Sequence, residues 1–83
     1  MVQLQLQLIK GSFDKSEALE LISQMVHVKI KYHENKIKES EKEEDIKMRE
    51  KRIKQLQHEF HELRTQLMSV DQTINIESGI GIA

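Results

Sequence analysis

Four histidines, His27, His33, His58 and His61, are the residues whose type could support metal chemistry. His58 and His61 lie three residues apart in the segment His-Glu-Phe-His-Glu, and two histidines on one helix face can share a metal ion. If the chain folds back near residue 40, His27 comes within about two helical turns of His58. The candidate ligands of a metal site are therefore His27, His58 and His61.

The spacing of these histidines does not match the established metal motifs. A zincin helix separates its two histidines by four residues rather than three, and neither His58 nor His61 has a glutamate three residues before it, as di-iron bundles require. The chain contains no cysteine, which excludes disulfides, thiolate metal ligands and cysteine nucleophiles. We therefore predict no metal and no cofactor, and zinc titration tests the three candidate histidines.

No arrangement of residues predicts catalysis. Carboxylates are abundant, but they fall on segments that we expect to be exposed helix faces, whereas catalytic carboxylates lie in a cleft that shifts their pKa values. Gly79-Ile80-Gly81 is not followed by a helix, as a phosphate-binding loop would be. We expect no catalytic residues and predict that the protein is not an enzyme.

The elements that must position any site follow from hydrophobic periodicity. Residues 2–9 alternate apolar side chains with glutamine, which predicts a strand that ends at Lys10-Gly11. A capping-box pattern at Asp14 and Glu17 predicts a first helix over residues 14–38, and a second such pattern at Ser40 and Glu43 predicts a helix over residues 41–70. Residues 73–77 alternate again as a short strand, and the glycines that follow predict a flexible tail over residues 78–83.

The second helix carries a heptad seam, which is typical of packing against another helix. Seven of its eight core positions are apolar and the exception is Arg49. These positions are Ile46, Arg49, Ile53, Leu56, Phe60, Leu63, Leu67 and Val70. Continued backwards in the same register, the pattern falls on Ala18, Leu21, Met25, Val28 and Tyr32.

The first helix carries a second apolar stripe outside that register. A helix that is apolar on two sides is normally buried on more than one side, so we expect this helix to be central and to meet a second copy of the chain or the apolar strand face. The predicted oligomer interface consists of Leu19, Ile22, Val26, Ile30 and Ile37, with Leu4 and Leu6 from the strand.

These elements predict one domain over residues 1–83 with an α+β fold that is mostly α. Its order is strand-helix-helix-strand, with a long antiparallel helical hairpin that is completed by dimerisation. The alternative is one continuous helix from about residue 15 to residue 70 in an intermolecular coiled coil. The polar residues Asn35, Glu39 and Lys42 at three successive core positions favour a break near Ser40 and therefore the hairpin.

The sequence does not identify a biochemical function. A chain of 83 residues buries only about 60% of its unfolded surface and is marginal as a monomer, so the leading hypothesis is a self-associating structural or protein-interaction module, with a homodimer preferred. The alternatives are a metal-binding protein that uses the histidines and a nucleic-acid-associated regulator that uses the basic segment 47–54.

Charge and hydropathy bear on partners and location. The net charge is −1 with both signs mixed along the chain, whereas nucleic-acid binding needs a one-signed basic surface and membrane binding favours a basic polar helix face. No segment resembles a secretory signal or approaches the roughly 20 apolar residues of a membrane span. We expect a cytoplasmic protein without membrane contact and without nucleic acid.

Overall fold

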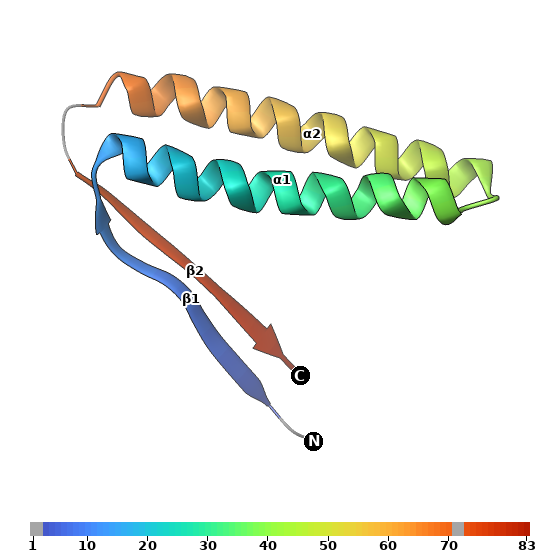
Figure 1. Ribbon diagram of the computed structural model, residues 1–83, viewed down its shortest axis with the longest axis horizontal. Coiled ribbons are helices and arrows are strands. Elements are labelled where there is room, and N and C mark those ends of the chain that lie inside the picture. Colours follow the sequence, from blue (N-terminus) through green and yellow to red (C-terminus); the bar gives the residue numbers. More distant parts are fainter. Residues whose placement is uncertain (1–2, 71–72) are drawn as a thin grey trace.

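The computed structural model describes residues 3–70 and 73–83, in the order β1 (Leu4–Phe13), α1 (Lys15–Glu39), α2 (Glu43–Met68) and β2 (Ile74–Ile82). The helices lie side by side as an antiparallel hairpin, and the strands pair as an antiparallel ribbon that leaves the hairpin at an angle (Figure 1). The predicted element order and the helical hairpin are confirmed, and the continuous helix is excluded. Completion of the fold by a second copy stays a prediction.

Two polar contacts hold the end of the hairpin from which the strands leave. The Asp14 carboxylate accepts a hydrogen bond of 2.8 Å from the backbone N–H of Glu17, so the predicted cap at the start of α1 is present. The Lys15 ammonium donates to the carbonyl of Met68 at 3.2 Å, which satisfies a backbone acceptor at the end of α2. The start of α1 is thereby tied directly to the end of α2.

The turn between the helices lies where the sequence indicated, but Ser40 has a different role there. Ser40 is the residue that ends α1, and α2 begins two residues later than predicted, at Glu43. The Ser40 hydroxyl accepts from the backbone N–H of Lys42 at 3.2 Å, so it closes the turn instead of capping α2. Lys42 occupies the N-cap position of α2 without a side-chain cap bond from the described residues. Three acidic residues in the first turn, Glu43, Glu44 and Asp45, stabilise it through the helix dipole.

The face that α1 turns toward α2 is not the one obtained by continuing the heptad register. His33 of α1 contacts Arg49 of α2, and Leu19 and Phe60 line one groove between the helices. Residues three and four apart share a helix face. Together with His33, this α2-facing stripe consists of Leu19, Ile22, Val26, Ile30 and Ile37, which are all half-buried. Val28 and Tyr32, on the continued register, are instead 68% and 48% exposed.

The α2 seam itself lies where the heptads placed it. Leu67 is buried, and the other seam residues within α2 are half-buried, while Val70 lies beyond the end of the helix. The continued register failed on α1 because the turn at residues 40–42 interrupts the helix, and the heptad phase does not survive a non-helical segment.

A β-bulge decides which side chains of β1 share a face. Leu4 pairs with Ile82 and Leu6 with Ile80, but the register shifts between Gln7 and Ile9. An extra residue in one strand moves all later side chains to the opposite face. After the bulge, the odd-numbered apolar residues Ile9 and Phe13 therefore join Leu4 and Leu6. One face of the ribbon is therefore mostly apolar, and its other members are Gly11 and Ser78.

Both strands are longer than the sequence predicted. β1 passes through Lys10-Gly11 to Phe13, and β2 continues through residues predicted to be a flexible tail; Val2 lies outside the described residues. Gly11 has φ +154° and the Phe13 ring lies 3.8 Å from the position a Cβ would take. The aromatic ring thus covers the glycine, and the strand continues through a residue type that usually weakens strands.

The molecule is a single layer of elements with little interior. Its extents are 46 × 38 × 13 Å, and the shortest is about the diameter of one helix with its side chains. Among the described residues, the only buried apolar side chains are Ala18 and Leu67. None of the helices in the described part of the chain is long and apolar enough to cross a membrane.

Replacement of Val26 and Ile30 by glutamate tests the α2-facing stripe. The Val26→Glu plus Ile30→Glu variant should lower the free energy of unfolding by at least about 2 kcal/mol, because apolar burial is lost and two charges are desolvated. Urea unfolding followed by circular dichroism measures this change. Lys31→Gln plus Lys38→Gln changes the net charge equally at exposed positions and should have little effect. Wild-type stability of the glutamate variant would contradict the packing described here.

Candidate functional site

The four histidines are divided between exposed surfaces and the helix interface. His27, His58 and His61 are exposed, whereas His33 is buried. Helical periodicity places all three outside the faces through which α1 and α2 contact each other. No group of three histidine, cysteine, aspartate or glutamate side chains in the described chain is arranged to hold a metal ion. The structure therefore does not bring the three candidate ligands together.

His33 and Arg49 form one polar layer across the otherwise apolar helix interface. The Arg49 guanidinium lies 3.1 Å from Nδ1 of His33 and 3.3 Å from the carboxylate of Asp45. Arg49 is the one polar residue of the α2 seam, and the residue opposite it on α1 is the polar His33. A polar layer in an apolar seam penalises shifted registers, so this contact sets how α1 and α2 align.

The protonation of His33 follows from its partner. A guanidinium can only donate, so Nδ1 accepts and the proton of the neutral ring is on Nε2, a buried atom that has no hydrogen-bond partner among the described residues. Burial, followed by the positive charges of Lys29, Arg49 and Arg52, lowers the pKa of the His33 imidazole. The folded protein therefore holds His33 in its neutral form.

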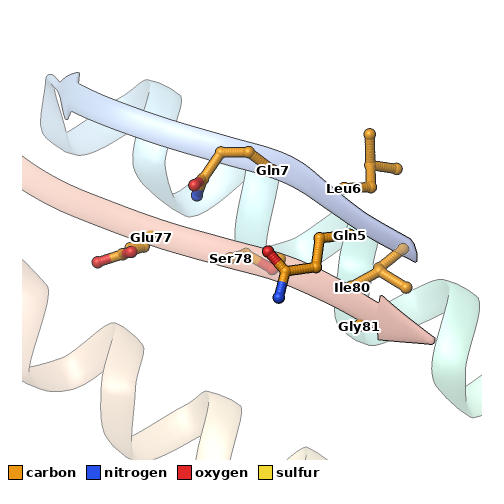
Figure 2. A pocket seen from close by; sticks show the side chains of 8 residues that line it. Gln5, Leu6, Gln7, Glu77, Ser78, Ile80 and Gly81 are labelled. Atoms are coloured by element: carbon orange, nitrogen blue, oxygen red, sulfur yellow. The ribbon is translucent and has the colours of Figure 1, made fainter. Parts of the chain in front are cut away.

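The polar face of the ribbon carries an open hollow of about 470 Å³ near its tip. Figure 2 shows Gln5 and Gln7 extending over β2, while Leu6 points away from it. The residues opposite these glutamines in the register are Gly81 and Gly79, which leave the space that the amides overlie. The lining offers the amide groups of Gln5 and Gln7 and the Glu77 carboxylate but no buried polar group, so it does not select a particular ligand.

The apolar face of the ribbon changes in exposure along its length. Near the hairpin, Ile9, Phe13, Ile74 and Ile76 are half-buried, and Phe13 shares a hollow with Leu21 of α1. Toward the termini, the ribbon moves away from the helices (Figure 1). There the same face is exposed to solvent. We call this exposed part the outer apolar face. It consists of Leu4, Leu6, Ile80 and Ile82, which are 56%, 53%, 46% and 54% exposed.

A second exposed apolar strip lies along α1 and consists of Met25, Val28 and Tyr32. Positive charge surrounds its aromatic member. The Lys29 and Lys36 ammonium groups and the Arg49 guanidinium lie 5.2, 5.9 and 5.9 Å from the centre of the Tyr32 ring. This strip is therefore apolar in the middle and cationic at its border.

The basic residues of segment 47–54 are interleaved with carboxylates. Three of them form ion pairs. The pairs are Lys47–Glu43 at 3.3 Å, Arg49–Asp45 at 3.3 Å and Arg52–Glu59 at 4.0 Å. The two exposed pairs, Lys47–Glu43 and Arg52–Glu59, contribute little stability. All three pairs mix positive and negative charge along this segment, whereas a nucleic-acid-binding surface is uniformly basic.

Sequence reasoning identified part of the exposed apolar surface. Leu4 and Leu6 of the predicted interface are on the outer apolar face, and the five predicted residues of α1 are half-buried toward α2; their role in an oligomer stays a prediction. Ile80 and Ile82 lie in the segment predicted to be a flexible tail, although they continue the alternation of Ile74 and Ile76, which only Ser78 interrupts. The sequence analysis did not place His33 in the helix interface. Its position three residues after Ile30 and four before Ile37 would have indicated that it shares their helix face.

Comparison of the chain with protein-family models, curated proteins and solved structures finds no match.

The buried, neutral His33 predicts a specific dependence of stability on pH. An unfolded histidine has a pKa near 6.5, so between that value and the lowered pKa of His33 the unfolded chain binds more protons than the folded protein. The free energy of unfolding should therefore fall as the pH is lowered below about 6.5 toward the lowered pKa of His33. His33→Gln keeps an acceptor for Arg49 and cannot titrate, so it should reduce this slope. Equal slopes in urea titrations of both proteins would show that His33 is not held neutral.

Proposed function

We propose that the chain is a small self-associating structural or protein-interaction module, in which the complete folded unit contains two copies. The observation that carries this proposal is the surface that one chain leaves exposed. The single chain has an accessible surface of 7004 Å², whereas a compact monomer of 9.8 kDa is expected to expose about 5,200 Å².

The excess of about 1,800 Å² per chain has the size of a dimer interface. Twice this area falls within the range of roughly 2,000–5,000 Å² that obligate homodimers bury. The radius of gyration supports the same proposal, because it is 15.7 Å against about 11.8 Å for a compact domain of this length. A second copy would convert the single layer into two packed layers around a core, which is the usual architecture of a stable domain.

The proposal also accounts for where the chain places its charges. Both signs are spread over the exposed helix faces, and the formal net charge is −1, so two copies approach each other without strong repulsion. The exposed apolar side chains instead lie mainly on the ribbon and on one strip of α1.

Sedimentation equilibrium at micromolar concentration tests this proposal. We expect a particle of twice the 9.8 kDa chain mass, with a thermal midpoint that rises as protein concentration is increased tenfold, because mass action favours the folded dimer. A particle of 9.8 kDa with a cooperative melt that is independent of concentration would refute the proposal.

A further inference from the structure

We infer that the two copies meet through the outer apolar faces of their ribbons, packed face to face. This inference rests on the proposed function, and it adds the surface and the partner: residues Leu4, Leu6, Ile80 and Ile82 of a second copy of the same chain.

The outer apolar face has the chemistry of half a protein core. Its cross-strand pairs, Leu4 with Ile82 and Leu6 with Ile80, are all large aliphatic side chains, and each is about half exposed. A two-stranded ribbon with such a face is not stable alone in water and needs a covering layer. The helical hairpin lies close to the other end of the ribbon, where Ile9, Phe13, Ile74 and Ile76 are half-buried, but it does not reach the outer apolar face (Figure 1).

A second copy fits this face better than a partner of different chemistry. The four residues carry no charge or hydrogen-bonding side chain, so they offer nothing that selects an acidic, basic or polar ligand. An isologous dimer brings the same patch from both sides, and an aliphatic patch is complementary to itself. Two sheets packed this way lie about 10 Å apart with interdigitated side chains.

The other exposed apolar strip is less suitable for contact between copies. Lys29, Lys36 and Arg49 surround Tyr32 on α1, and two copies that met there would bring these like charges together. The nearest charged pair on the ribbon, Lys10 opposite Glu77, lies on the polar face and combines both signs. Electrostatics therefore favours the ribbon over the helix.

Two copies could also pair through the free edges of their ribbons. This arrangement can be distinguished by experiment from face-to-face packing. The bulge at Leu8 interrupts the ladder of β1, which is a common protection of an edge strand, whereas β2 remains regular. Pairing of β2 with its copy would place side chains of both ribbon faces near the two-fold axis. Face-to-face packing brings together only the side chains of the apolar face.

Single-cysteine cross-linking separates these arrangements, because the chain has no cysteine of its own. Leu4→Cys, Leu6→Cys, Ile80→Cys and Ile82→Cys are each treated with a short bismaleimide, with Gln5→Cys and Gln7→Cys as matched controls on the opposite face of the same strand. Val28→Cys reports contact through α1. We expect covalent dimers from at least one apolar-face position and from none of the controls.

Each other outcome overturns the inference. Equal cross-linking on both faces would indicate edge pairing, and cross-linking at Val28→Cys alone would indicate a helical interface. A dimeric mass without any cross-link would reject the ribbon contact but leave the proposed self-association standing. A monomeric wild-type mass would reject both.

A second pair of variants tests the same contact with a separate check that the protein is folded. Leu6→Gln plus Ile80→Gln should raise the dissociation constant at least about 100-fold through lost aliphatic burial, whereas Val28→Gln should leave it nearly unchanged. Circular dichroism at high protein concentration must show that both variants keep the helical hairpin. An unchanged dissociation constant for the ribbon variant would overturn the face-to-face contact.

Discussion

The structure is governed by one constraint: a layer of elements 13 Å thick cannot enclose a core. Folding must offset a backbone entropy cost of about 1–2 kcal/mol per ordered residue, chiefly by removing apolar surface from water. A single chain of this protein does so along one helix interface and at the base of the ribbon. The rest of its apolar surface faces solvent, and this deficit leads to the proposal of a second copy.

Within the single chain, the helix interface combines apolar packing with one polar layer. Leucine, isoleucine and valine side chains form most of the contact, while His33, Arg49 and Asp45 introduce charge and hydrogen bonding near its turn end. Hydrogen bonding by Ser40 first, and then by Arg49, lowers the pKa of the Asp45 carboxyl against the opposing effect of burial. The Asp45 carboxylate that pairs with Arg49 is therefore stabilised in its charged form close to the point where the chain reverses.

The sequence predicted features that depend on neighbouring residues. The capping pattern at Asp14 located the start of α1, the α2 heptads identified the residues that face α1, and three polar core positions located the reversal of the chain. These features are local, since each depends on side chains within one or two helical turns.

Features that depend on contacts between distant segments were not predictable in the same way. The choice between the two α1 stripes is made by α2, whose polar residue Arg49 pairs with His33. At Leu8 the apolar side chains of β1 change from even-numbered to odd-numbered positions. In the sequence this change resembles the end of a strand, because a bulge is recognised only by its pairing with β2. For the candidate site, Leu4 and Leu6 were predicted from alternation, but their partners Ile80 and Ile82 follow a glycine-rich segment that resembles a loop.

The most direct test of the central claim is an isotope-filtered nuclear Overhauser experiment on an equal mixture of ¹³C-labelled and unlabelled chains. We predict intermolecular signals between the methyl groups of Leu4, Leu6, Ile80 and Ile82. If these methyl groups showed contacts only within one chain, while the particle tumbled as a monomer, the claim that a second copy covers the ribbon would be contradicted.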